Sequence, residues 1–415
     1  MNRHTVQRYY GFKLVFASLF IGIVASFLAF SLKQITEFSQ EHIFSLAERK
    51  GSLWFFFLPT IGITGIYFLR KYLFKNRKNK GITEIYDTLG QRRDHLPFFK
   101  IPSHYINGFM TVIFGGSTGI EVSTVVATAT VGNAVYKQQF AAKAYKQELV
   151  SAGVVAGIGV LFGNPLVGVL FVLEVIARKT SRALLVSSMV AGIVAWVFLA
   201  CFRPRPLIML SITDWHWRAV PFMVLLSLLC GVLSAYFTAL VIRIKTFFSR
   251  IHNNFIRVNL GALVVGALIF FFPFLYGDSY HSLNQLLSNP RSCSVLFLFM
   301  LVLLKPLASS LTLGAGGDGG VFAPSIVTGA YLGLAFSMAC NMLFGTSLIP
   351  VNFMLIGIAA TLSASIFAPF TALVLACSMI PHGYVLFLPV LLGCIVSKTM
   401  AQKILPYNVY TYKHK

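Results

Sequence analysis

Long apolar runs alternate with short polar segments along almost the whole chain. Several runs approach the ~20 residues that an α-helix needs to cross the hydrocarbon core of a bilayer. They cover residues 12 to 32, 53 to 69, 149 to 173, 182 to 200, 219 to 242, 259 to 276, 294 to 304, 349 to 377 and 383 to 397. Because other runs are shorter or broken by Gly and Pro, the pattern predicts an all-α polytopic membrane protein with roughly 10 to 18 helices.

Composition and charge agree with a membrane protein and indicate its topology. Hydrophobic residues make up 57% of the 415 residues and charged residues only 11%. Lys and Arg outnumber Asp and Glu by 34 to 12, and the basic residues gather in short segments between the runs and at both ends. This distribution is typical of the positive-inside rule, with both termini cytoplasmic and the first run retained as a helix. The same charges would also attract anions to the cytoplasmic mouth of a pathway.

Several classes of function lack their motifs. The chain has no GxxxxGK[ST] or HExxH sequence, no CxxC pair, and no histidine pair at ligand spacing within an apolar run. We therefore expect no metal, no cofactor and no enzymatic activity. A lipid-modifying membrane enzyme would need clustered His, Asp or Arg at a membrane face. No basic run belongs to a soluble module, so nucleic acid is not an expected partner.

A weak internal repeat divides the chain into halves. In each half a Gly-rich break is followed by a helix start that combines Phe and Pro: "GGSTGIE" precedes "FGNPLVGVLFVLEV", and "GAGGDGGVFAP" precedes "FAPFTALVLACSM". Paired Gly/Pro-interrupted segments of this kind are typical of inverted-repeat transporters. We predict a single transmembrane domain over residues 1 to 415, with repeats at about 12 to 202 and 215 to 402.

Three of the twelve acids are predicted to lie in the membrane, where an ionisable group must face a cavity, a partner or a protonation site. Glu121 is either a structural acid or a functional one, and the three glycines before it favour function. Glu174 is followed by Arg178 and Lys179, which favours a structural ion pair. Asp318 lies in a Gly run, where helix capping and function are equally supported. The other acids are expected in polar loops: Glu37, Glu41, Glu48, Glu84, Asp87, Asp94, Glu148, Asp214 and Asp278.

Three helix starts follow a Gly break, namely "NKGITEI", "GGSTGIEVST" and "GGDGGVFAPS". The first N–H groups of a helix have no internal partner and carry the positive end of the helix dipole, and glycine lets a ligand approach the backbone. One such start is commonly just tight helix packing. Three in a basic polytopic protein predict a small-anion site built from backbone amides.

These residues resemble the CLC family of chloride channels and proton-coupled chloride exchangers, from about residue 14 to Lys413. The stretch "GGSTGIEVSTV" is similar to the family's GREGP motif, of which Gly119 and Glu121 are kept. The resemblance implies that Glu121 is the gating glutamate. In the family this side chain occupies an anion site when ionised and leaves the site when protonated.

Two further motifs imply anion ligands. The family's GxFxP motif is kept at Gly320, Val321 and Phe322, which implies that backbone amides at this motif bind the anion. The C-terminal segment "YNVYTYK", within residues 403 to 415, is similar to the family's pore-tyrosine segment. Tyr410 takes the tyrosine position, with Tyr407 and Tyr412 as competitors.

The inner anion motif departs from the family. In "NKGIT", Gly81 and Ile82 match and are implied anion ligands, but Lys80 stands where the family has a chloride-contacting serine. Lys80 either strengthens anion attraction or extends to the cytoplasm and leaves only the two amides. We favour the second interpretation.

A second departure concerns proton coupling. The helix "FGNPLVGVLFVLEV" aligns Glu174 with the first acid of the family's motif, while Val175 takes the place of the internal proton-transfer glutamate. This favours channel-like or loosely coupled chloride transport. Obligatory chloride/proton antiport is the alternative, and a fluoride exporter is a third, weaker hypothesis.

The resemblance also implies a CLC-type fold of tilted and broken helices in two inverted-topology repeats. It implies a homodimer with one pore per subunit, chloride and other small anions as substrates, and protons as a further candidate. We expect a chain of the prokaryotic type, without the cytoplasmic nucleotide-binding modules of the family's eukaryotic members. We therefore expect it in the bilayer of a bacterial inner membrane.

Overall fold

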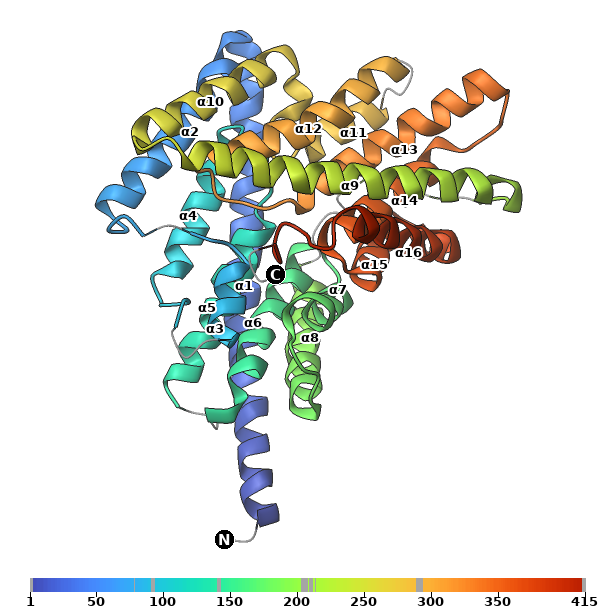
Figure 1. The fold of residues 1–415 in the computed structure, drawn as a ribbon. Coiled ribbons are helices and arrows are strands. Elements are labelled where there is room, and N and C mark those ends of the chain that lie inside the picture. Colours follow the sequence, from blue (N-terminus) through green and yellow to red (C-terminus); the bar gives the residue numbers. More distant parts are fainter. Residues whose placement is uncertain are drawn as a thin grey trace. The chain divides into compact units, whose positions relative to one another are not determined.

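A computed structural model of the chain consists of helices joined by short turns (Figure 1). It describes residues 3 to 77, 79 to 90, 94 to 139, 143 to 202, 208, 212, 214 to 288 and 294 to 412, with the backbone alone for 3 to 8, 143 and 288. Within these residues there are 16 α-helices and no strand beyond one isolated bridge. The predicted all-α class is confirmed.

The chain divides into two compact units, each built from discontinuous segments. The first unit comprises Met1–Ile35, Lys78–Ile106 and Glu121–Arg205. Two helices, α1 and α4, run from this unit into the second. The elements of the first unit are the first part of α1 (Arg3–Lys50), α3 (Thr83–Gly90), the first part of α4 (Lys100–Ile113), α5 (Glu121–Lys137), η1 (Lys143–Tyr145), α6 (Lys146–Leu161), α7 (Pro165–Phe171), the π-turn η2 (Val172–Ile176) and α8 (Arg182–Phe202).

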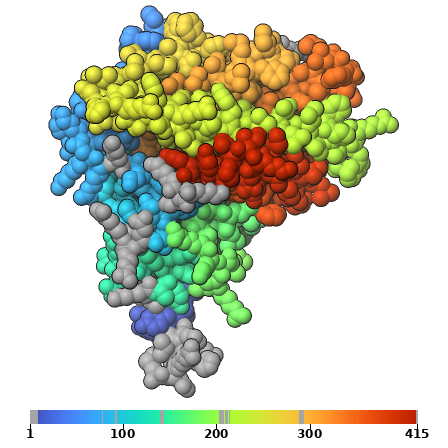
Figure 2. Space-filling model, in the orientation of Figure 1, coloured from blue at the N-terminus to red at the C-terminus, as the bar shows by residue number. Residues whose placement is uncertain are grey.

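The second unit comprises Thr36–Arg77, Asn107–Ile120 and Pro206–Lys415. Besides the ends of α1 and α4, it holds α2 (Leu53–Tyr72), η3 (Trp217–Ala219), α9 (Val220–Ser249), α10 (Asn254–Phe271), η4 (Pro273–Leu275), α11 (Tyr280–Ser288), α12 (Val295–Ala315), α13 (Phe322–Phe344), α14 (Pro350–Ile366), α15 (Pro369–Met379), η6 (Gly383–Leu386) and α16 (Phe387–Ile404). In this unit α9 lies along α16, as the space-filling view shows (Figure 2).

Eight helices of the described residues are long and apolar enough to cross a membrane: α1, α2, α8, α9 with η3, α10, α12, α13, and α16 with η6. The chain is therefore an integral membrane protein, as predicted. The core helices α5, α6 and α14 have only 16 or 17 residues. Helices shorter than the ~20 residues of a full span can begin or end inside a membrane domain.

Glycines let the buried helices approach closely. In the second unit, a Cβ built on Gly333 of α13 would lie 2.1 Å from the carbonyl oxygen of Phe353 on α14. In the first unit, a Cβ on Gly153 of α6 would lie 2.1 Å from the carbonyl oxygen of Thr128 on α5. Neither contact leaves room for a side chain. The backbones of these helix pairs pack as small-residue interfaces do in membranes.

Two apolar runs that the sequence presents as continuous are each two helices. The run from 149 to 173 breaks at Gly163, which has a φ of +71°, and α7 restarts with Asn164 as N-cap accepting a hydrogen bond from the N–H of Leu166. The run from 349 to 377 breaks at Phe367, with a φ of +60°, before Pro369 opens α15. Proline suits the first position of a helix because its missing N–H would have no intrahelical partner there.

Candidate functional site

The Gly-rich loop before Glu121, residues 115 to 119, requires glycine at its first position. Gly115 has a φ of +86°, and a Cβ there would lie 2.6 Å from Cε2 of Tyr276. The hydroxyl of this buried tyrosine donates to the carbonyl oxygen of Ile113, at 2.5 Å. The end of α4 is thus fixed where the loop begins.

Helix α12 holds the loop through Ser117. Its N–H donates to Oγ1 of Thr312 at 3.1 Å, and its carbonyl oxygen accepts from Oγ of Ser309 at 2.5 Å. All three side chains are fully buried. Both backbone polar groups of Ser117 therefore have partners, which fixes the loop's path.

A buried lysine completes the attachment. The Nζ of Lys305, on α12, donates to Oγ of Ser117 at 2.8 Å, to Oγ of Ser279 at 2.7 Å and to the carbonyl oxygen of Gly277 at 2.8 Å. Lys305 has no exposed surface. An ammonium group in such a place is costly unless its donors are all used. Lys305 thus joins the loop to the turn before α11.

The start of α13 lies beside this loop. Gly119 and Gly320 form an isolated antiparallel bridge. Gly319 has a φ of +153°, and a Cβ there would lie 2.4 Å from Oγ1 of Thr118. Two of the three Gly-rich segments singled out in the sequence are therefore adjacent within the second unit.

Asp318 does not cap α13, whose N-cap is Val321. Its carboxylate lies 3.8 Å from the guanidinium of Arg70, and its N–H donates to Oγ1 of Thr111 at 2.9 Å. Arg70 also donates to the carbonyl oxygen of Gly316 at 2.8 Å. Of the two roles left open by the sequence, capping is wrong, and the contacts are those of a structural ion pair.

Val321 and Phe322 are both 1% exposed at the start of α13. The ring of Tyr410 lies 6.3 Å from the ring of Phe322, centroid to centroid. Tyr410 is buried, whereas Tyr407 and Tyr412 are partly exposed. The structure thus brings the GxFxP motif and the predicted pore tyrosine together and favours Tyr410 over its competitors.

Glu121 is the first residue of α5 and is 3% exposed. Negative charge is favoured there because the first N–H groups of a helix point toward it. Gly81, in the turn before α3, has a φ of +68°, and a Cβ there would lie 3.1 Å from Cγ1 of Val122. In the first unit, the turn of the inner anion motif therefore abuts the first turn of α5.

The turn that contains Gly81 and Ile82 is fastened by side chains of α3. Oε1 of Glu84 accepts from the N–H of Lys80 at 2.7 Å, and Oγ1 of Thr83 donates to the Lys80 carbonyl oxygen at 2.9 Å. The side chain of Lys80 is exposed. This fits the interpretation in which the lysine extends to solvent and leaves the backbone amides.

Glu84 is buried in α3, so the prediction that it lies in a polar loop is wrong. It is 2% exposed and forms an ion pair with Lys100, at 2.7 Å, while Nε2 of His104 lies 3.4 Å from its second oxygen. Burial alone would raise the pKa of Glu84, but the hydrogen bonds and charges of His104 and Lys100 outweigh it and lower this pKa. Glu148 was assigned to a loop in the same way and is also buried, in α6.

Val175 lies in the π-turn η2, where its carbonyl oxygen accepts from the hydroxyl of Tyr86 at 2.9 Å. Valine offers no proton-binding group. Glu174 is partly buried beside it, and Arg178 donates to the carbonyl oxygen of Tyr86 at 3.1 Å. The predicted pairing of Glu174 with Arg178 or Lys179 stays a prediction.

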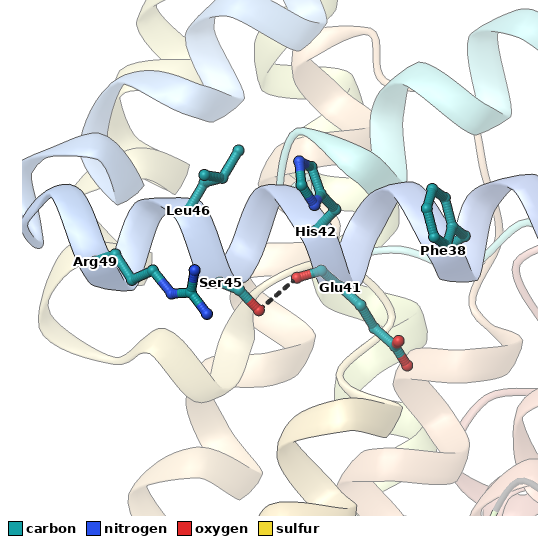
Figure 3. Close-up of a pocket in the computed structure, with 6 residues that line it drawn as sticks. All are labelled: Phe38, Glu41, His42, Ser45, Leu46 and Arg49. Atoms are coloured by element: carbon teal, nitrogen blue, oxygen red, sulfur yellow. Dashed lines mark hydrogen bonds between the residues drawn. The ribbon is translucent and has the colours of Figure 1, made fainter.

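A surface pocket of about 290 Å³ lies on the C-terminal part of α1 (Figure 3). Its lining residues are Phe38, Glu41, His42, Ser45, Leu46 and Arg49, all from this one helix. Ser45 donates to the carbonyl oxygen of Glu41 within the helix, at 2.8 Å. The pocket includes none of the predicted anion ligands and is an exposed polar helix face. Within the described part of the chain, no cluster of three or more metal-ligating side chains occurs.

Lys305 and the Glu84 cluster were not predicted from the sequence. Lys305 follows directly on an apolar run, in "LVLLKPLASS", and a basic residue at such a place indicates a functional or structural site. His104 and Lys100 had no comparable signal, because they lie outside the long apolar runs and their partner Glu84 is distant in sequence.

The family model for voltage gated chloride channels matches residues 61–402. The chain belongs to this family. Over 372 residues it is 26% identical to the H(+)/Cl(-) exchange transporter ClcA of Salmonella typhi, covering 86% of this chain and 78% of that relative. Membership of the family confirms the resemblance drawn from the motifs and supports anion transport.

Solved structures share the fold. A slow cyanobacterial Cl-/H+ antiporter has a TM-score of 0.83 at 22% identity, covering 96% of both chains. A CLC-type fluoride/proton antiporter has a TM-score of 0.81 at 21% identity, covering 99% of this chain and 98% of the other. At these identities the likeness is one of fold, and it confirms the predicted CLC-type architecture.

Proposed function

We propose that this protein is an obligatory exchanger of chloride for protons. The relative that is 26% identical is named an H(+)/Cl(-) exchange transporter, which favours exchange over the channel-like transport that Val175 suggested. The observation that carries the proposal is Glu121, a buried carboxylate at the first residue of α5, directly after a loop fixed by α12. Such a group can bind and release a proton where backbone amides attract anions.

Glu121 acts as the gate. Ionised, its carboxylate competes with the transported anion for backbone N–H groups. Protonated, it loses its charge and releases them, so that acid opens the path. Each cycle of protonation on one side and deprotonation on the other moves a proton against the anion.

The proposed anion ligands in the first unit are the backbone amides of Gly81 and Ile82, with the Lys80 side chain in solvent. In the second unit they are the amides of Gly320, Val321 and Phe322 and the hydroxyl of Tyr410. The proposed assembly is a homodimer with one pore per subunit in a bacterial inner membrane, with both termini cytoplasmic. The basic segments between helices support that orientation.

A paired-flux assay on purified protein in liposomes tests the proposal. With a chloride gradient imposed, chloride efflux and external pH are recorded together. Obligatory exchange predicts uphill proton movement driven by the chloride gradient. Chloride movement without proton movement would contradict exchange and restore the channel-like hypothesis. Replacing chloride with fluoride in the same assay tests the third hypothesis.

A further inference from the structure

The first unit contains a buried cluster of titratable groups that lies beside the inner anion motif. It joins Glu84 of α3 to Lys100 and His104 of α4, with 2%, 5% and 0% of their surfaces exposed. Lys100 Nζ donates to Oε1 of Glu84 at 2.7 Å and to Oδ1 of Asn79 at 3.1 Å. Oδ1 of Asn79 also accepts from Ser103, at 3.2 Å.

The cluster can take up one further proton, on the imidazole of His104. Ionised Glu84 and Lys100 cancel, so the cluster is neutral with a neutral imidazole and carries one positive charge with an imidazolium. The contact of 3.4 Å from Nε2 of His104 to Oε2 of Glu84 is longer than an ordinary hydrogen bond. An imidazolium would shorten it to a charge-assisted bond. Histidine is also the side chain that changes charge near neutral pH.

The turn before α3 links the cluster to an exposed residue and to the first turn of α5. Glu84 accepts a hydrogen bond from the backbone N–H of Lys80. The side chain of Lys80 is exposed, so this bond connects the cluster to a surface residue. The same turn continues into Gly81, which packs against Val122, the residue after Glu121. On its other side α3 contacts the π-turn, through the hydroxyl of Tyr86.

We infer that the His104 and Glu84 pair is the inner proton-loading site of this protein, in place of the acid that Val175 lacks. This inference rests on the proposed exchange function. The imidazole of His104 takes one proton from the inner solution and becomes an imidazolium, while Glu84 stays ionised. The imidazolium then gives up the same proton, through water, to the carboxylate of Glu121, which becomes a neutral acid.

Other charged groups surround the elements that carry the pair. Lys100 lies on α4. Lys146, the first residue of α6, donates to the carbonyl oxygen of Thr88 on α3. From the segment after the π-turn, Arg178 donates to the carbonyl oxygen of Tyr86. The π-turn itself carries Glu174, α5 carries Glu121 at its start and Lys137 at its end, and α3 carries Asp87. Among them Glu174 is the rival proton acceptor, because it lies next to Val175.

The test uses the full-length protein in the paired-flux assay, first as wild type and then as His104→Gln. Glutamine keeps a hydrogen-bonding side chain but binds no proton. We expect the proton flux to fall by about a hundredfold, the scale of a lost acid–base group, while chloride flux persists. His42→Gln, on the exposed face of α1, is the control and keeps both fluxes. The pH dependence of proton flux should differ between wild type and His104→Gln.

The outcomes separate the two claims. If wild type moves no protons, the exchange function fails and this inference fails with it. If wild type couples and His104→Gln couples equally, only the inference is overturned. If chloride and proton fluxes of His104→Gln fall together, the histidine is structural and the inference is wrong. Loss of coupling in Glu174→Gln with retention in His104→Gln would move the role to Glu174.

Discussion

Replacing Lys305 with methionine tests what holds the Gly-rich loop of residues 115 to 119, which precedes the proposed gate Glu121. Methionine has nearly the same length but lacks the ammonium group, so the loop and the turn before α11 lose their common donor. The three short bonds go to Ser117, Ser279 and the carbonyl oxygen of Gly277. Because the site is fully buried, water does not replace the lost donor.

The expected loss in the free energy of unfolding follows from the buried groups that no longer have Lys305 as a hydrogen-bond donor. The hydroxyl of Ser279 already donates to the carbonyl oxygen of Tyr276, at 3.2 Å, and Ser117 keeps its bonds to α12. The carbonyl oxygen of Gly277 loses a charged donor, and a buried group without a partner costs about 1–3 kcal/mol. Adding the weakened hydroxyl contacts, we expect Lys305→Met to lower the free energy of unfolding by about 2–4 kcal/mol.

The assay compares thermal unfolding in detergent with the pH dependence of chloride flux in liposomes. Lys33→Met is the matched control, because Lys33 is also buried but is held by a bond of 3.0 Å to the carbonyl oxygen of Leu161. Lys305→Arg should recover part of the stability. A loosened loop should also change the pH dependence of chloride flux, which Glu121 sets in the proposed function. Equal destabilisation by Lys305→Met and Lys33→Met, with an unchanged pH profile, would refute this account of the loop.

Two smaller predictions concern packing and pH. Gly333→Ala should destabilise the protein in detergent, since its Cβ would lie 2.1 Å from the carbonyl oxygen of Phe353; Gly11→Ala, with nothing within 4 Å, should not. The pKa of Asp94 is lowered, because bonds from Lys137, Leu96 and Asn133 outweigh burial. Its stabilisation is present above the unfolded pKa and is lost as pH falls, below about pH 4. Asp94→Asn should remove this loss of stability at low pH, which is measured as the free energy of unfolding across a pH series.

Fold class and membrane insertion could be predicted because hydropathy reports them directly. The run from 182 to 200 matches α8 closely, whereas the run from 12 to 32 is only the apolar middle of α1, which extends into polar residues at both ends. Helix breaks were harder, since Phe367 adopts a positive φ with no glycine to signal it. The core helices α5 and α13 were recognised only by their starts, because Thr, Ser and Gly dilute their hydropathy while packing buries every side.

Candidate ligands could be predicted from local motifs, whereas contacts between residues distant in sequence could not. Gly320, Phe322 and Tyr410 follow from short sequence matches. The bond from Lys305 to Ser117 joins residues 188 positions apart, and no local pattern reveals it.

The central claim is that Glu121 is the proton-binding gate. Chloride and proton fluxes should be measured together across a pH series for wild type and Glu121→Gln in liposomes. Glutamine mimics the protonated acid, so the account predicts chloride flux that no longer depends on pH and no coupled proton movement. Chloride flux in Glu121→Gln that keeps the wild-type pH dependence and still drives protons would contradict it.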